Sequence, residues 1–354
     1  MAKIPILTDT HCGIRNSSQV FIDYQEKFYK DVFFPYCKEN NVKTILHGGD
    51  YYDHRKYVNF KAQHSNRKMF LEPLRQMGMH MDIIPGNHDV FYKNTNELCS
   101  LKELLGFYTA NVNIIMQPTV NDYNGLHIAM LPWVNNSNYT ESVDFIKQCK
   151  APWLLGHLEL DGFEMMKGVT NQGGMNAALF QRFERVLTGH FHTKSTKGNI
   201  DYLGSSMEFT WADCDDPKYF HVIDTETREL EKVRNPITLF KKIWYDDTNT
   251  DYSNYDVSVL DDHFIKIMVQ NKSDPFMFDK FVDRINDRDI HELKVAEDFS
   301  EFMGENVQDA KVNFKDTSEI LNSYIDEIDT SLNREKLKQL MNGIYIESIN
   351  KDII

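Results

Sequence analysis

This sequence of 354 residues gives little indication of disulfide bonds or membrane-spanning segments. The five cysteines are odd in number and form no C-x-x-C pair, so we interpret them as reduced thiols of an intracellular protein. The longest apolar runs, such as residues 128–131, are far shorter than a membrane-spanning helix. No secretory signal is expected, because residues 3–7 lead directly into a polar motif. We therefore expect a cytoplasmic protein without membrane contact.

Positive charge is also scarce. The chain has 39 Lys and Arg against 53 Asp and Glu, for a net charge of −14, which weakens a nucleic-acid-binding function. Much of the acidity is local, in residues 244–262 and 297–330. Five basic side chains fall close together: Arg55, Lys56, Lys61, Arg67 and Lys68. The net charge therefore argues against nucleic-acid binding without excluding it.

Five short apolar segments are each followed by potential metal ligands. Residues 4–7 precede Asp9 and His11, residues 44–46 precede Asp50, residues 81–84 precede Asn87, residues 153–155 precede His157, and residues 186–187 precede His190 and His192. Such runs are typical of buried strands. The apolar spacing between them predicts helices over 21–38 and about 60–77. This alternation predicts an α/β sheet with its ligands at the carboxyl ends of the strands.

The pattern changes after about residue 235. Residues 264–269 and 291–295 read as strands and residues 276–285 as a helix, which predicts a small α/β unit. An acidic connection over 297–317 leads to two helical segments. Their apolar stripes are Ile320, Leu321, Tyr324, Ile325 and Ile328, then Leu337, Leu340, Met341, Ile344 and Tyr345. We therefore expect a catalytic domain over 1–235, a small domain over 236–300, and a linker with a C-terminal helical pair over 301–354.

Carboxylates and neutral imidazoles are the side chains that hold water-activating divalent metals. Two metals about 3.5–4 Å apart need a bridging ligand, and a carboxylate serves this purpose well. Asp50 follows a strand and two glycines that permit a sharp turn, so it is the expected bridge. The other expected ligands are Asp9, His11 and His192 for one metal, and Asn87, His157 and His190 for the second. Gly189 is expected to permit the kink that turns both nearby histidines inward.

His88 lies between the asparagine ligand and Asp89. Its imidazole is placed to donate a proton to a leaving oxygen, and we expect Asp89 to fix its tautomer. Each cluster alone is explained as well by a polar loop at the end of a strand. The ordered set of five clusters, each after a strand, favours a metal site.

This ordered set resembles the signature of the calcineurin-like metallophosphoesterase superfamily, which reads D-x-H, G-D-x-x-D, G-N-H-D, G-H and G-H-x-H. The resemblance implies a two-sheet α/β sandwich flanked by helices. It also implies a pair of Mn²⁺ ions, or Mn²⁺ with iron, at the edge of the sheets. The motifs assign the same seven ligands, with His88 as the catalytic histidine.

Within this superfamily, phosphoprotein phosphatases carry phosphate-binding arginines where this chain has His54 and Pro85. The chain is more similar to SbcD-type DNA double-strand-break repair nucleases, including those of large tailed phages. Residues 9–13 resemble their D-x-H-L-G with Cys12 in place of Leu, and residues 156–163 resemble the phage form of the fourth motif. Residues 202–205 and 216–220 are similar to the hairpin that closes the nuclease domain.

The resemblance implies a Mn²⁺-dependent nuclease that is a 3′→5′ exonuclease on duplex ends and an endonuclease on single strands or hairpins. It would act in DNA recombination and repair, in the host cytoplasm if the chain is phage-encoded. The small domain would cap the nuclease domain, and the C-terminal helices would bind an SbcC-type coiled-coil ATPase. Helices near residues 69–74 and 98–105 would form a homodimer, although burial within one chain explains their apolar residues equally well.

Several interpretations remain open from the sequence. The possible DNA-binding residues are His54, Arg55, Lys56, Arg67 and Lys68, for which a solvated surface is the simpler reading. The enzyme is alternatively a phosphatase or cyclic-nucleotide phosphodiesterase with an unrelated C-terminal appendage. A non-enzymatic scaffold with a decayed metal site is the third possibility, and the intact ligand set argues against it.

Overall fold

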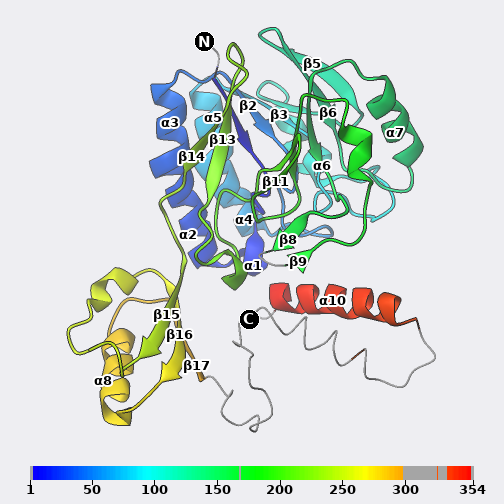
Figure 1. The fold of residues 1–354 in the computed structure, drawn as a ribbon. Coiled ribbons are helices and arrows are strands. Elements are labelled where there is room, and N and C mark those ends of the chain that lie inside the picture. The colour runs from blue at the N-terminus through cyan, green and yellow to red at the C-terminus, as the bar shows by residue number, and fades with distance from the viewer. Residues whose placement is uncertain (1–2, 167–168, 298–324, 326–332, 352–354) are drawn as a thin grey trace. The chain divides into compact units, whose positions relative to one another are not determined.

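The computed structural model describes residues 3–166, 169–297, 325 and 333–351 (Figure 1). The chain divides into two compact units, Met1–Thr238 and Leu239–Ile354. The division expected at residue 300 lies outside the described residues. So does the first C-terminal apolar stripe apart from Ile325, which is helical and buried. Among the described residues, no helix has the length and apolar character needed to cross a bilayer.

The first unit contains two six-stranded sheets. In spatial order, the first sheet consists of β14 (Leu230–Arg234), β13 (Tyr219–Asp224), β1 (Lys3–Leu7), β2 (Thr44–His47), β3 (His80–Ile83) and β4 (Val112–Ile114). The second consists of β11 (Ser195–Lys197), β12 (Ile200–Tyr202), β10 (Arg185–Gly189), β7 (Trp153–His157), β6 (Leu126–Leu131) and β5 (Thr119–Tyr123). The five predicted strands are all present as β1, β2, β3, β7 and β10, and the two-sheet α/β class is confirmed.

The two sheets share an apolar core. Ile6 and Leu46 from the first sheet and Leu155 and Leu187 from the second belong to one buried cluster. Burial of each such side chain contributes about 1.5–3 kcal/mol relative to exposure. Because β1, β2 and β3 run parallel, as do β6, β7 and β10, the carboxyl ends of each set lie at one edge of its sheet. The loops that carry the expected ligands follow these strand ends.

Both predicted helices form, and each contains a π-helical turn. The first comprises α2 (Gln19–Phe28), the turn Tyr29–Phe33 and α3 (Phe34–Glu39). The second comprises α4 (Phe60–Asn66), the turn Arg67–Leu71 and α5 (Glu72–Gln76). A proline follows each turn, at Pro35 and Pro73. Proline lacks an N–H and its ring disturbs the preceding helical turn, and the wider π turn relieves this conflict.

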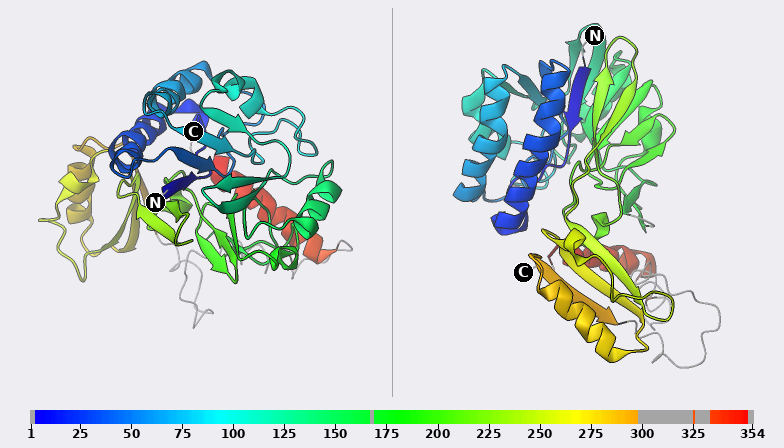
Figure 2. Two further views of the ribbon diagram at one scale, coloured as in Figure 1. Left: turned by 90° about the horizontal axis from the view of Figure 1, so that it is seen from above. Right: turned by 90° about the vertical axis from the view of Figure 1, so that its left-hand side faces the viewer.

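These helices flank the first sheet, whereas α7 (Tyr139–Gln148) flanks the second (Figure 2). The Tyr29 and Phe70 rings lie 4.9 Å apart and join the two long helical segments. Shorter elements complete the unit: α1 (Ile14–Ser17), α6 (Ser100–Leu105), β8 (Glu164–Met166) and β9 (Val169–Thr170).

The second unit has a three-stranded parallel sheet of β15 (Phe240–Asp246), β16 (Phe264–Asn271) and β17 (Glu292–Glu297). Helix α8 (Pro275–Asn286) packs on one face, where Phe281 and Ile285 join a buried cluster with Ile243 and Ile267. The predicted elements at 264–269, 276–285 and 291–295 are confirmed, and β15 is an additional strand. The second predicted C-terminal segment forms α10 (Arg334–Lys351).

Candidate metal centre

All seven expected ligands lie at or just beyond the carboxyl ends of parallel strands. Asp9 and His11 follow β1, Asp50 follows β2, Asn87 follows β3, His157 ends β7, and His190 and His192 follow β10. Five of them are buried, and four belong to strand ends of the first sheet and three to strand ends of the second. The strand ends therefore bring together side chains that are up to 183 residues apart in the sequence.

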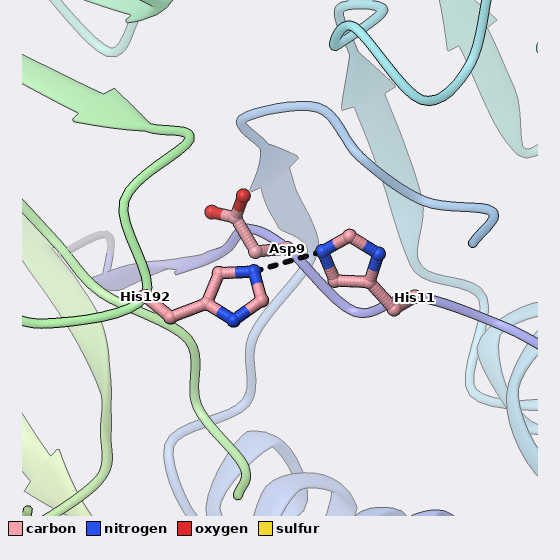
Figure 3. Close-up of side chains that lie close together, drawn as sticks. All are labelled: Asp9, His11 and His192. Carbon is pink, nitrogen blue, oxygen red and sulfur yellow. Dashed lines mark hydrogen bonds between the residues drawn. The ribbon is translucent and has the colours of Figure 1, made fainter. Parts of the chain in front are cut away.

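Asp9, His11 and His192 form the first ligand group (Figure 3). One ligating atom of each lies within 4.8 Å of the others, and the Nε2 atoms of the two histidines are 3.0 Å apart. The Asp9 carboxylate accepts hydrogen bonds from the Thr8 hydroxyl at 2.6 Å and from the His190 backbone N–H at 3.0 Å. These donors orient the carboxylate, as outer-shell groups do at metal sites.

Asp50, His157 and His190 form the second group, again with ligating atoms within 4.8 Å of one another. The amide oxygen of Asn87 lies 3.0 Å from Nε2 of His157 and 2.8 Å from Nδ1 of His190. Nδ1 of His157 lies 2.8 Å from the Gly48 carbonyl, which leaves Nε2 for a metal. The three residues expected for each metal thus lie close together, and Asp50, expected as the bridge, lies with the second set.

Four of these ligands have backbone conformations that L-residues rarely adopt. The φ angles are 52° at Asp9, 45° at His11, 53° at Asp50 and 92° at His190. Such conformations cost about 1–3 kcal/mol each and persist only where the surroundings enforce them. Backbone hydrogen bonds supply part of that enforcement, from Asp9 N to Gly49 O at 3.0 Å and from His11 N to Asp50 O at 3.1 Å.

The expectation that Gly189 supplies the kink between the two neighbouring histidines is wrong, because the positive φ is at His190 itself. Gly189 is instead required for close packing. A Cβ atom there would lie 2.0 Å from the Thr8 hydroxyl oxygen and 2.7 Å from an Asp9 carboxylate oxygen. Gly86 has a similar role, since a Cβ there would lie 2.2 Å from Oδ1 of Asp50.

The pKa values of the expected ligands shift in both directions. Against the effect of burial, the hydrogen bond to Asp53 and the Asp50 charge raise the pKa of His11, and Asp50 raises that of His157, each to about 9. Burial lowers the pKa of His192 to about 3, and burial with the nearby His157 holds the pKa of His190 well below its usual range. Burial disfavours the charged form of Asp50, but the adjacent His157 and His88 outweigh it and hold the Asp50 pKa well below its usual value. Neutral imidazoles and an ionised carboxylate are the forms that bind divalent cations. The carboxylates and imidazoles grouped here are donors that divalent metal ions bind, and binding would release the protons of His11 and His157.

The expected pairing of Asp89 with His88 is not found. The Asp89 carboxylate accepts hydrogen bonds from the backbone N–H groups of Tyr51, Tyr52 and Gly86, at 3.1, 3.0 and 2.9 Å for the shortest contacts. Burial and the Asp50 charge raise its pKa to about 7. Asp89 thus ties together the two loops that carry Asp50 and Asn87, because these amides have no strand partner at the turn.

Asp53 takes the place that was expected for Asp89. Its backbone carbonyl lies 2.5 Å from Nδ1 of His88, and its Oδ1 lies 3.2 Å from Nδ1 of His11. A carbonyl only accepts, so His88 carries its proton on Nδ1. One atom each of His11, Asp53 and His88 lie within 4.8 Å of one another as a third candidate group. The second aspartate of G-D-x-x-D was the signal in the sequence for this residue.

A cluster of charged side chains around Lys218 holds the backbone of His192. Nζ of Lys218 donates to the His192 carbonyl at 3.0 Å, to Asp213 at 2.6 Å and to Asp216 at 2.8 Å. The Phe209 ring packs against His11 and His192, with centroids 5.6 and 5.9 Å away. This support belongs to the segment between β12 and β13, two strands that lie in different sheets and so do not pair as a hairpin with each other. The sequence analysis noted the segment only as a resemblance.

We expect Lys218→Met to lower the free energy of unfolding by about 3 kcal/mol, because it leaves the Asp213 charge buried without its partner. Metal affinity at the first group should fall roughly 10–100-fold, since His192 loses its orienting donor. Urea denaturation and calorimetric metal titration measure the two effects. Lys232→Met, on an exposed position of β14, is the matched control. A metal affinity equal to that of the control would show that Lys218 does not position His192.

The five candidate DNA-binding residues separate into two groups. His54 and Arg55 lie at the rim of the centre: Nε2 of His54 is 3.6 Å from Oδ2 of Asp53, and the charge of Asp50 opposes the lowering of the Arg55 pKa by burial. Lys56, Arg67 and Lys68 are exposed, and Arg67 lies 3.5 Å from Glu72. For these three, the contacts of the described residues include none to a metal ligand.

Comparison with known proteins agrees with this centre. The family described as calcineurin-like phosphoesterase matches residues 2–194. "Exonuclease subunit 1" of Enterobacteria phage T4 is 29% identical over 352 residues, which cover 98% of this chain and 99% of that protein. An archaeal phosphodiesterase structure has 16% identity and a TM-score of 0.35 over 66% of this chain and 99% of its own.

The purple acid phosphatase PPD1 of yellow lupin (Lupinus luteus) has 15% identity and a TM-score of 0.41, over 66% of this chain and 51% of its own. At such TM-scores the two solved structures carry no weight, whereas the family match covers more than half of the chain. The chain belongs to the calcineurin-like phosphoesterase family and is an enzyme that cleaves phosphoester bonds.

Proposed function

We propose that the enzyme is a Mn²⁺-dependent DNA nuclease, a 3′→5′ exonuclease on duplex ends and an endonuclease on single strands. It would act in recombination and double-strand-break repair within the cytoplasm of a bacterial host. The observation that carries this proposal is the similarity to a protein named as an exonuclease subunit, which extends over both units of the chain. Similarity confined to the catalytic unit would have left the substrate open.

The proposed ligands are Asp9, His11 and His192 for one metal and Asn87, His157 and His190 for the other, with Asp50 as the bridge. When bound, two divalent ions neutralise phosphate charge and activate water. The three oxygen donors among these residues suit Mn²⁺, which prefers carboxylate and carbonyl ligands.

His88 is the proposed proton donor to the leaving 3′ oxygen. Its Nδ1–H is held by the Asp53 carbonyl at 2.5 Å, so His88 would donate from Nε2 in its doubly protonated form and would be left as the neutral Nδ1–H imidazole. Arg55 and His54 at the rim would contact the phosphates on either side of the scissile bond, since an arginine offers several donors to phosphate oxygens.

The alternative is a phosphatase or cyclic-nucleotide phosphodiesterase with an unrelated C-terminal appendage. Two observations weigh against it: the absence of arginine at His54 and Pro85, and the extension of the phage similarity through the second unit. Mg²⁺- or Mn²⁺-supported turnover of p-nitrophenyl phosphate or a cyclic nucleotide, without turnover of DNA, would favour this alternative.

The test is digestion of end-labelled duplex and single-stranded DNA by the purified chain with Mn²⁺, and with the metal removed by EDTA. We expect the duplex to shorten from its 3′ ends and the single strand to be cut internally, both only with Mn²⁺. Bis-p-nitrophenyl phosphate, p-nitrophenyl phosphate and cyclic nucleotides are the comparison substrates. Intact DNA alongside active hydrolysis of any of these would refute the nuclease proposal.

We also propose an SbcC-type coiled-coil ATPase as a partner, bound through the C-terminal helices, of which α10 is described. The relative named as a subunit supports a multi-chain assembly. Deletion of residues 316–354 should abolish co-purification with that ATPase, and unchanged co-purification would contradict this contact.

We also propose a homodimer, but through a different surface from the one expected from the sequence. Phe70, Leu74, Leu101 and Leu105, in the helices expected to form it, are buried within the unit. Phe60 and Phe107 are each 92% exposed and are the better candidates for a contact between two chains.

A further inference from the structure

The loop after Asp50 carries an aromatic pair that faces solvent. The rings of His54 and Tyr57 stack with centroids 4.6 Å apart and an interplanar angle of 21°. Tyr57 is 58% exposed, and its hydroxyl lies 3.4 Å from the Asn16 side-chain oxygen. One exposed aromatic residue is ordinary on a protein surface. Here the ring is held in a fixed orientation by contacts on two sides while much of it stays accessible.

This pair is close to the metal centre. Nε2 of His54 lies 3.6 Å from Oδ2 of Asp53, whose other carboxylate oxygen lies 3.2 Å from Nδ1 of the ligand His11. The Asp53 carbonyl also holds His88. A single residue, Asp53, therefore contacts His54 and His11 through its carboxylate and the proposed proton donor through its carbonyl.

The same loop offers positive charge beside these rings. Arg55 directly follows His54, and Lys56 directly precedes Tyr57. Arg55 is within electrostatic reach of Asp50. Cations bind the phosphate of a nucleotide and an aromatic face binds its base, and single-strand-binding proteins combine these two features. Phosphate chemistry at the proposed metal centre and an accessible ring on the loop after Asp50 therefore suit the phosphate and the base of a nucleotide.

We propose that Tyr57, supported from one side by His54, is a stacking site for an unpaired nucleobase next to the scissile phosphate. The inference rests on the proposed function, because it requires a nucleic-acid substrate. Only an unpaired base presents its face to a side chain, so the site favours single strands and frayed duplex ends. Stacking tolerates any base, and we therefore expect no sequence preference from it.

Binding is the direct test, with EDTA present so that no cleavage occurs. The probes are a single-stranded oligonucleotide and the same strand with abasic residues throughout a short central block. Tyr57→Ala should weaken binding of the complete strand about tenfold, as expected for loss of one base–aromatic stack. It should leave the affinity for the strand that contains the abasic block unchanged. Tyr57→Phe keeps the ring and should bind like the parent protein, and His54→Ala should have an intermediate effect.

Tyr139→Ala is the matched control, because Tyr139 is 48% exposed on α7 and lies outside the proposed site. Unchanged binding of the complete strand by Tyr57→Ala would overturn the inference. An equal loss on both strands would overturn it too, since the ring would then act through the phosphates or the fold. If Tyr57→Ala instead changes the mass of the oligomer in solution, while the two strands differ in affinity as they do for the parent protein, the ring belongs to a contact between two chains.

These outcomes are separate from the test of the nuclease proposal. If the parent protein cleaves DNA with Mn²⁺ while Tyr57→Ala binds both strands normally, only the stacking site fails. If the parent protein cleaves other phosphodiesters but leaves DNA intact and unbound, the proposed function fails and the stacking site fails with it.

Discussion

Replacing Asp50 by asparagine is expected to remove hydrolytic activity and to lower the metal content of the enzyme. Oδ2 of Asp50 lies 3.3 Å from Nε2 of His157, and Oδ1 of Asp50 accepts a hydrogen bond from the His88 backbone N–H at 2.7 Å. Asparagine has almost the same shape but no charge, and its NH₂ group cannot bind a cation. The loss of rate should exceed the roughly 100-fold typical of an outer-shell partner, because a shared ligand is removed.

Elemental analysis by mass spectrometry measures metals per chain, and hydrolysis of bis-p-nitrophenyl phosphate measures the rate. Asp122→Asn is the matched control, because Asp122 is exposed and its carboxylate only accepts a hydrogen bond from Gly125 N at 2.6 Å. Two metals per chain in Asp50→Asn, with the parent rate, would contradict the bridging role.

His88→Gln is expected to lower the rate of DNA cleavage by about 10²–10⁴-fold, the usual contribution of a general acid. The effect should depend on the leaving group. A 3′ oxygen of DNA needs a proton when it leaves, whereas p-nitrophenolate leaves readily without one. The loss on bis-p-nitrophenyl phosphate should therefore be much smaller than the loss on DNA.

Metal content separates this role from ligation. His88 lies with His11 and Asp53 in a third possible ligand group, so the question is a real one for this centre. We expect His88→Gln to keep the full metal content, and loss of a metal would reassign His88 as a ligand. Equal losses of rate on both substrates would argue against proton donation.

Local patterns made the strands that carry the expected ligands predictable. Apolar runs before the expected ligands identified β1, β2, β3, β7 and β10, because a strand that is buried on both faces is apolar at consecutive positions. Strand β15 was not predicted, since Lys241 and Lys242 interrupt its apolar pattern. It forms because Ile243 and Tyr245 reach the cluster beneath α8. Burial by distant residues, which a local pattern does not contain, decides such a strand.

By itself, the sequence predicted which side chains would gather at the edge of the sheets, because each expected ligand follows its strand within one short motif. Chemical reasoning also predicted which of them would lie close together. Tertiary structure alone decided that Asp53 holds His88, that Asp89 ties two loops together, and that the positive φ is at His190. It also revealed Lys218 beneath His192, 26 residues away. These contacts join separate segments, and their geometry depends on how the two sheets pack, which no single segment encodes.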